Sequence, residues 1–254
     1  MSSPAYYEQP LNERARLLMR LEFVFKKLDN VVSDPTPVEQ MQAINGLLDL
    51  SDLVGRGDTT SEVTKELERI SHNLKGLQHI PSVDSVRLNK ILDNVGSLST
   101  RLSQQTPKHY KTTINNELLC HLKRRQHVTC GNTEFDQPAL QHWLFKPDQT
   151  RIQQIIDWSE PFVTLNLAVK LILQLIRESA QAKLQSAEAG FYQQTLDPEQ
   201  PVQIIRVAPD DPTCYPVISA GRHRFTLRFM RQTGIDPASQ VDGQVAFQLA
   251  CCSV

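Results

Sequence analysis

The sequence predicts an α+β protein, in which a mostly helical bundle domain is packed with a smaller antiparallel β-sheet domain. Up to about residue 180, apolar side chains recur every three or four positions, as on one face of an amphipathic helix. After Ala182 they recur at every second position between turn residues, which is typical of antiparallel strands. Helices followed by strands indicate the α+β class. We expect a mainly helical domain at residues 10–180, the candidate for dimerisation, and a β domain at 183–254, joined by the N-terminal strand 4–9 and the segment 126–137.

Composition is typical of a soluble globular protein. Of the 254 residues, 40% are hydrophobic and 22% are charged, and the formal net charge is -1, so no overall basicity favours nucleic acid as a partner. The longest apolar run, Phe162–Ile176, is interrupted by Asn166 and Lys170 and is too short and polar to cross a bilayer. The opening MSSPAYYEQP lacks the positive start and apolar run of a signal peptide. We therefore expect a cytoplasmic protein without membrane insertion.

Two helices are expected in the first part of the chain. The first begins after Asn12, a favourable N-cap residue, and continues to about Leu28. The second begins at Pro37, which suits the first turn of a helix, and ends at Gly55. The side chains that we expect to be buried are Leu17, Leu18, Leu21, Val24, Phe25 and Leu28 in the first helix and Val38, Met41, Ile44, Leu47 and Leu48 in the second.

The next two helices have heptad-like spacing and predict an antiparallel hairpin. Thr59 and Glu62 have the spacing of a capping box, and Ser82 after Pro81 is expected to cap the second helix. The expected contact residues are Val63, Leu67, Ile70 and Leu74 in one helix and Leu88, Ile91, Val95, Leu98 and Leu102 in the other. Packing within the chain explains this spacing more simply than a dimer contact.

Four more helices complete the helical region. One is expected at residues 112–125, a short one begins near Pro138, and another is capped at Asp148. A long helix from about Glu160 to Ala180 is expected to lie at the centre of the bundle, because its apolar stripe is wide. That stripe consists of Leu165, Leu167, Ala168, Leu171, Ile172, Leu175 and Ile176.

Five segments with alternating side chains are predicted strands, and short turns between them predict an antiparallel sheet. They are Lys183–Thr195, Pro201–Val207, Tyr215–Ala220, Gly221–Met230 and Gln244–Cys251.

The stretch from Gly221 to Arg231 is the candidate binding element. Successive side chains of a strand point to opposite faces, so its apolar residues share one face and its basic residues the other. The apolar face is Phe225, Leu227 and Phe229, and the other face is Arg224, Thr226 and Arg228, with Arg222, His223 and Arg231 adding positive charge. Because no acidic residue lies within this stretch, it predicts a basic docking surface built on a strand.

Two other pairs of arginines allow alternative interpretations. Arg16 and Arg20 are four residues apart in the first helix and lie outside its apolar stripe. They belong either to a solvated face or to a second part of the docking surface. Arg124 and Arg125, together with the strand arginines, would serve a nucleic-acid-binding protein. Against this, the strand's phenylalanines point away from its arginines and are not placed to stack on bases beside them.

A zinc-dependent enzyme is the third hypothesis, using the cysteines with His121 or His127. The cysteines are Cys120, Cys130, Cys214, Cys251 and Cys252. Their spacing matches none of the usual zinc-ligand pairs, and buried reduced thiols are the simpler explanation. Phosphate-binding, dinucleotide-binding, zinc-protease and serine-hydrolase motifs do not occur. We therefore expect a protein that is not an enzyme, without catalytic residues, metal or cofactor.

Short segments in a fixed order over nearly the whole chain resemble the ZapD family, bacterial cell-division proteins that associate with FtsZ. They are Glu8–Glu13 (E-x-P-L-N-E), Arg20–Phe23, Arg56-Gly57, Lys65–Leu67, Phe135-Asp136, Trp143-Leu144, Leu175–Arg177, Gly190–Tyr192, Tyr215-Pro216, Arg224-Phe225, Arg228–Met230 and Leu249–Cys252.

The resemblance implies a homodimer with a helical and a β domain that binds the C-terminal tail of FtsZ. It thereby implies crosslinking of FtsZ filaments into bundles at the division ring. Arg224 and Arg228 match basic positions of the β domain that the family uses for the tail, and Arg56 matches another basic position. Glu117 and Gln141 depart from the family pattern, which has a basic residue and a histidine there. The resemblance therefore does not extend the contact surface to residues 110–142.

Overall fold

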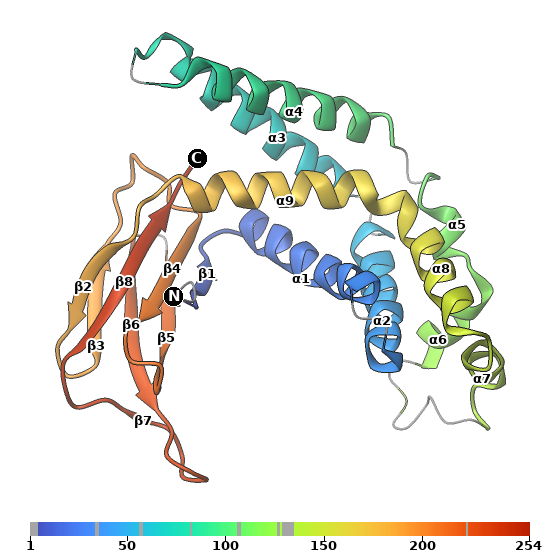
Figure 1. The fold of residues 1–254 in the computed structure, drawn as a ribbon. Coiled ribbons are helices and arrows are strands. Elements are labelled where there is room, and N and C mark those ends of the chain that lie inside the picture. The colour runs from blue at the N-terminus through green and yellow to red at the C-terminus, as the bar shows by residue number, and fades with distance from the viewer. Residues whose placement is uncertain are drawn as a thin grey trace. The chain divides into compact units, whose positions relative to one another are not determined.

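The computed structural model describes residues 5–33, 36–55, 58–81, 83–105, 108–125, 128, 135–221 and 223–254. The chain divides into two compact units, one made of Met1–Leu17 with Leu173–Val254 and the other of Leu18–Ile172. The first carries the strands and the second most of the helices, so the protein is α+β as the sequence predicts (Figure 1). The predicted segment 126–137 lies mostly outside the described residues.

The helical elements follow the predicted order, with additional short helices. They are α1 (Glu13–Ser33), α2 (Pro37–Gly55), α3 (Thr59–Gly76), η1 (Leu77–His79), α4 (Ser85–Ser103), α5 (Lys111–Ile114), α6 (Glu117–Arg125), α7 (Pro138–Leu144), α8 (Asp148–Ser159), η2 (Glu160–Phe162) and α9 (Val163–Glu178). The single helix predicted at 112–125 is wrong, because the chain leaves the helix at Asn115. The Asn116 side chain then accepts a hydrogen bond from the backbone N–H of Leu119 and caps α6.

Helices α3 and α4 lie side by side and form the predicted hairpin (Figure 1). Their predicted contact residues are buried, except Leu74 and Ile91, which are half-buried. Both predicted caps need correction. Thr59 lies inside α3, and its hydroxyl donates to the Leu53 carbonyl at 2.6 Å. Asp84 caps α4 by accepting from the backbone N–H groups of the two residues that follow Ser85.

Helix α9 is a core helix, as predicted, and Leu165, Ala168, Ile172 and Ile176 of the expected stripe are fully buried. The stripe is wrong at Leu167 and omits two buried residues. Leu167 is 45% exposed, whereas Val169 and Leu173 are fully buried. The stretch Asp148–Glu178 is long and apolar enough to cross a membrane, with a mean hydropathy of 1.3 over its most apolar window. Half of that window is buried inside the protein, as in the core helix of a soluble protein, so this is weak evidence for a membrane span.

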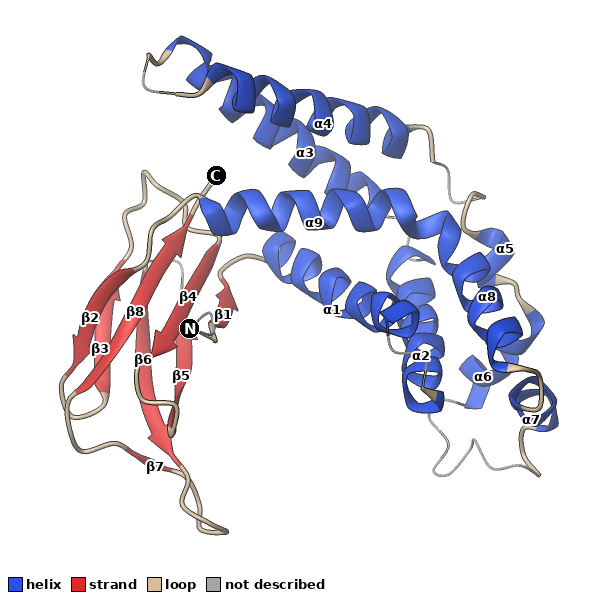
Figure 2. Cartoon of the chain, in the orientation of Figure 1, coloured by secondary structure: helices blue, strands red, loops and turns tan. Residues whose placement is uncertain are grey.

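The β unit contains two antiparallel sheets (Figure 2). The strands are β1 (Tyr7–Pro10), β2 (Lys183–Ala187), β3 (Phe191–Thr195), β4 (Ile204–Pro209), β5 (Cys214–Ala220), β6 (Arg224–Arg231), β7 (Ser239–Gln240) and β8 (Val245–Cys252). One sheet has the order β1-β4-β8-β2, and the other has the order β3-β6-β5 with β7 paired to β6.

The continuous strand predicted at Lys183–Thr195 is wrong, because β2 and β3 belong to different sheets. The chain turns between them at Ala189 and Gly190, which have φ values of 49° and 65°. A Cβ atom at Gly190 would lie 2.4 Å from the Val241 carbonyl oxygen, so this turn needs glycine for space as well as for conformation. Ala187, Ala189 and Phe191 recur at every second position and suggest one strand, although the more buried positions change phase at the turn, from Ala187 in β2 to Tyr192 in β3.

The inward side chains of both sheets share one hydrophobic core. Phe225, Leu227 and Phe229 of β6 are at most 1% exposed, as the alternation predicts. The Phe229 ring lies 5.0 Å from that of Phe247 on β8, and the Tyr192 ring lies 5.1 Å from Phe247. Each fully buried phenylalanine or leucine contributes about 1.5–3 kcal/mol relative to an exposed one. This core fixes which face of β6 is turned to solvent.

Candidate binding surface

The outer face of β6 carries two exposed arginines. Arg224 and Arg228 are exposed, and Thr226 between them is half-buried. Among the described residues, neither guanidinium has a hydrogen-bond or ion-pair partner. The two arginines are four residues apart, which corresponds to about 13 Å of strand. Because both are cationic, exposed and uncompensated, they can bind carboxylates of another molecule, bidentately where the geometry allows.

The strands on either side of β6 complete this outer face. Arg224 pairs with Thr195 of β3, and Thr226 pairs with Gln193 on one side and Ser219 on the other. Arg228 pairs with Phe191 on one side and Val217 on the other, which are 40% and 48% exposed. The sequence placed these residues in strands but missed their place beside Arg228, because the register of the sheet decides it.

Arg231, predicted to add to the positive charge, is compensated. Its Nη2 donates to Asp211 Oδ2 at 2.6 Å, and its Nε donates to Thr213 Oγ1 at 3.2 Å. The pKa of Asp211 is lowered, chiefly by the hydrogen bonds that Thr213 donates to its carboxylate and further by Arg231. Asp211 is distant in sequence from Arg231 and comes beside it because β5 and β6 are paired.

The other predicted site residues are distributed over the rest of the chain. Arg16 Nε donates to Glu13 Oε1 at 3.3 Å, an exposed contact within one turn of α1. Arg20 is exposed and has no partner among the described residues. Arg56 and Arg222 lie outside the described residues. The structure therefore brings together Arg224 and Arg228 on one face, and that pair is the core of the candidate site.

The basic end of α6, proposed for nucleic acid, is partly compensated. Arg125 Nη1 donates to Asp136 Oδ1 at 2.7 Å, and Lys123 forms an ion pair with Asp52. Arg124 is exposed. Positive charge near the last turn of a helix also interacts favourably with its dipole, which explains this run without a ligand.

The cysteines do not form a metal centre within the part of the chain that the structure describes. No group of three or more His, Cys, Asp or Glu side chains there could hold a metal ion. Cys120, Cys214, Cys251 and Cys252 are not in disulfide bonds. His127 and Cys130 lie outside the described residues. The pKa values of Cys214 and Cys251 are raised, mainly by burial, which disfavours the thiolate that a metal would bind.

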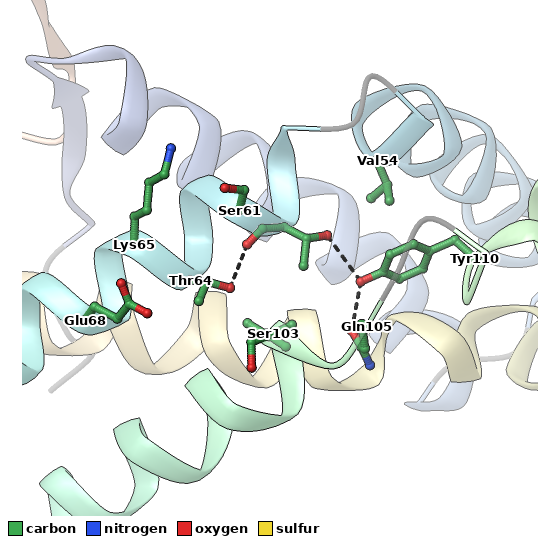
Figure 3. Close-up of a pocket in the computed structure, with 10 residues that line it drawn as sticks. Val54, Ser61, Thr64, Lys65, Glu68, Ser103, Gln105 and Tyr110 are labelled. Atoms are coloured by element: carbon green, nitrogen blue, oxygen red, sulfur yellow. Dashed lines mark hydrogen bonds between the residues drawn. The ribbon is translucent and has the colours of Figure 1, made fainter.

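A polar pocket of about 350 Å³ lies between α3 and the end of α4 (Figure 3). The Tyr110 hydroxyl donates to Gln105 Oε1 at 2.8 Å and lies 3.3 Å from Thr60 Oγ1. Burial raises the pKa of Tyr110, so its hydroxyl stays protonated. Its ring stacks on Phe162 with centroids 5.0 Å apart. These groups satisfy one another, which indicates a packing role for Tyr110.

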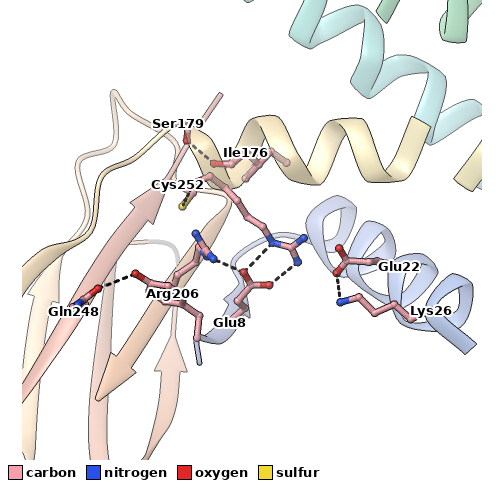
Figure 4. Close-up of polar contacts among 10 residues, drawn as sticks. Glu8, Glu22, Lys26, Ile176, Ser179, Arg206, Gln248 and Cys252 are labelled. Atoms are coloured by element: carbon pink, nitrogen blue, oxygen red, sulfur yellow. Dashed lines mark hydrogen bonds and ion pairs between the residues drawn. The ribbon is translucent and has the colours of Figure 1, made fainter. Parts of the chain in front are cut away.

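A second arginine pair in the β unit has an internal partner (Figure 4). Arg177 of α9 donates to both oxygens of Glu8, at 2.9 and 2.7 Å, and Arg206 Nε donates to Glu8 Oε1 at 2.8 Å. The side chains of Glu8, Arg177 and Arg206 are 14%, 21% and 22% exposed. The Arg206 guanidinium also lies 4.2 Å from the centre of the Tyr6 ring. We call these three charged residues the Glu8 cluster, and it holds β1, β4 and α9 together.

Comparison with known proteins gives a consistent result over almost the whole chain. A model of the ZapD family, described as a cell division protein, matches residues 19–228. Cell division protein ZapD of Coxiella burnetii is 33% identical over 251 residues, covering 98% of this chain and 97% of that protein. Cell division protein ZapD of Ralstonia nicotianae is 34% identical over 249 residues, with coverage of 97% and 98%. That of Cupriavidus pinatubonensis is 32% identical over 249 residues.

Proposed function

Because this chain belongs to the ZapD family of cell division proteins, we propose that it binds the C-terminal tail of FtsZ through the outer face of β6. It acts without catalysis in the cytoplasm, at the mid-cell division ring. As a homodimer it crosslinks FtsZ filaments into bundles and so stabilises the ring. The observation that carries this proposal is the pair of exposed, uncompensated arginines, Arg224 and Arg228, at positions that resemble the family's tail-binding residues.

The chemistry of the two partners is complementary. A flexible tail with carboxylates next to apolar residues offers negative charge to the guanidiniums and apolar side chains to the strand face. Each contact is partly exposed and screened by salt, so one tail binds weakly. Two sites on a two-fold dimer and many tails on a filament raise the overall affinity through avidity. The helical domain, residues 10–180, is the proposed place of dimerisation. Arg56, Arg222, Arg16 and Arg20 are proposed as additional contacts.

Sedimentation of FtsZ filaments tests the proposal. We expect the wild-type protein to sediment with FtsZ as bundles and the double variant Arg224→Ala/Arg228→Ala to lose this activity while remaining folded and dimeric. FtsZ without its C-terminal tail should not be bundled by either protein. Arg231→Ala is the matched control, because it removes an arginine from the same strand whose charge Asp211 already compensates. Undiminished bundling by the double variant would refute the proposed role of this face.

A further inference from the structure

The two arginines of the outer face have chemically different neighbours. Arg224 lies beside Thr195, and the next outward-facing residue of its own strand is Thr226, so this part of the sheet is polar. Arg228 lies between Phe191 and Val217, two exposed apolar side chains on the adjacent strands. We call Phe191, Arg228 and Val217 the mixed row. Side chains that are directly opposite in adjacent strands lie about 4.5–5.5 Å apart at Cβ, so the three form one contiguous patch.

The apolar character continues beyond the mixed row. Met230, the next outward residue of β6, pairs with Tyr215 of β5, and both side chains are half-buried. In the opposite direction, Thr226 pairs with Gln193 and Ser219, which are polar and exposed. The face is therefore polarised, with Arg228 among apolar groups and Arg224 among polar groups.

This difference changes what each guanidinium contributes to binding. A ligand that covers the mixed row removes apolar surface and water from around Arg228, which strengthens its ion pair with a carboxylate in that place. A carboxylate at Arg224 stays in a polar, hydrated environment, where ion pairs are weak and strongly screened by salt.

We propose that the mixed row is the specificity-determining subsite of the docking surface, taking an acidic peptide in which an apolar side chain adjoins a carboxylate. The carboxylate binds Arg228, and the apolar side chain packs on Phe191 and Val217. Arg224 attracts a second carboxylate through a screened interaction. Because extended chains rise about 3.3 Å per residue, the arginine spacing selects carboxylates four residues apart in an extended segment. This inference rests on the proposed function and deepens it.

The described residues of this face favour a peptide over a nucleic acid. Charge-driven binding to nucleic acid depends on many phosphate contacts, whereas this face offers two uncompensated guanidiniums in a chain of net charge -1. Val217 and Met230 add aliphatic surface, which suits apolar side chains. Phe191 and the half-buried Tyr215 are aromatic side chains on which a base could stack, so a nucleic-acid arm belongs in the test.

Peptide binding measured by fluorescence anisotropy tests the mixed row without any change to the protein. One labelled synthetic peptide carries two aspartates four residues apart, with leucine and phenylalanine next to one of them. A second peptide replaces the leucine and phenylalanine by serine at the same net charge. We expect the second peptide to bind at least tenfold more weakly, a ratio that corresponds to about 1.4 kcal/mol. Equal affinity for the two peptides would overturn the proposal.

Protein variants provide the reciprocal test. Phe191→Ser and Val217→Ser should each weaken binding of the first peptide several-fold and leave binding of the serine peptide unchanged. Leu184→Ser on β2 is the control, since Leu184 is also an exposed apolar side chain, at 69%, but belongs to the other sheet. Arg224→Gln should weaken binding at low salt and have little effect at high salt, whereas Arg228→Gln should weaken binding at both. Loss with Leu184→Ser equal to that with Phe191→Ser would overturn the proposal.

The outcome separates failure of this inference from failure of the proposed function. If Arg228→Gln abolishes FtsZ bundling but Phe191→Ser, Val217→Ser and the serine peptide behave as the unmodified forms, the proposed function holds and the specificity role is wrong. If the arginine variants still bundle FtsZ, the proposed function itself fails. Salt-sensitive binding of a labelled single-stranded oligonucleotide tighter than that of the first peptide, and lost in Phe191→Ser, would overturn the peptide assignment in favour of nucleic acid.

Discussion

The β unit holds two pairs of arginines that differ completely in their surroundings. Arg224 and Arg228 are exposed on β6 and have no partner among the described residues. Arg177 and Arg206 are about one-fifth exposed and share the carboxylate of Glu8. The first pair is available to another molecule, whereas the charge of the second is largely used inside the fold. An arginine in a basic stretch is therefore a binding residue only where the fold brings no carboxylate to it.

Arginines with and without a carboxylate partner occur on the same strand, as Arg231 shows. It lies three residues from Arg228 on the same strand, yet pairing of β5 with β6 places Asp211 within 2.6 Å of its guanidinium. The carboxylate partners of these three arginines are distant in sequence, by 169 residues for Arg177, 198 for Arg206 and 20 for Arg231. Counting the charges within a short stretch of sequence therefore misses these partners.

The largest expected effect comes from removing the carboxylate of the Glu8 cluster. Glu8→Ala leaves two mostly buried guanidiniums without their common partner, and we expect a loss of about 2–4 kcal/mol of unfolding free energy. Urea denaturation measures this loss. Glu199→Gln, which neutralises an exposed carboxylate of the same unit, should have no comparable effect. Equal stability of Glu8→Ala and the unmodified protein would remove the distinction between the two arginine pairs.

Cysteine labelling reports on the same cluster. Burial raises the pKa of Cys252 to about 11, although Arg206 and Arg177 act to lower it. The folded pKa lies above the unfolded value near 9.0. The contribution of the buried, protonated Cys252 thiol to the unfolding free energy is therefore complete below pH 9.0 and decreases as the pH rises toward about 11. We expect iodoacetamide to label folded Cys252 slowly at neutral pH, as mapped by mass spectrometry. Labelling of the native protein at the rate of an exposed thiol would contradict this assignment.

The exposed pair should behave in the opposite way to the Glu8 cluster. Arg224→Gln and Arg228→Gln, singly or together, should change the unfolding free energy by no more than about 0.5 kcal/mol, because exposed side chains without partners contribute little to stability. The same urea experiment measures this, and a larger destabilisation would show that these arginines have an internal role.

The smallest effect is expected at the Arg231 ion pair, which is exposed. The pKa of Asp211 is lowered, mainly by hydrogen bonds from Thr213. Its stabilising contribution is therefore present above the unfolded value of 3.8 and is lost as the pH falls through the lower folded value. Asp211→Asn should remove this small contribution, so it should lower stability slightly at neutral pH and reduce the acid dependence. Side-chain carboxyl NMR of Asp211 across the acid range provides the measurement, and a titration at or above 3.8 would contradict the prediction.

Much of the fold was predictable because it depends on patterns within short segments. Period-two alternation correctly separated Phe225 and Phe229 from Arg224 and Arg228, since a strand has only two faces. The predicted hairpin of α3 and α4 also follows from local spacing. The predicted element boundaries were wrong where a single side chain or turn determines where a helix or strand begins, as at Asp84, Asn116 and Gly190. There a hydrogen bond or a positive φ interrupts a pattern that otherwise continues.

The sequence by itself determined the α+β class, the family resemblance and which face of β6 is basic, because periodicity and motif order are properties of the chain alone. The tertiary structure decided which arginines remain uncompensated and which side chains flank them. Strand pairing and helix packing bring Glu8 into contact with Arg177 and Arg206. Strand pairing also places Asp211 beside Arg231 and both Phe191 and Val217 beside Arg228. The physical reason is that charge compensation and desolvation depend on distance in space, which separation along the chain does not fix.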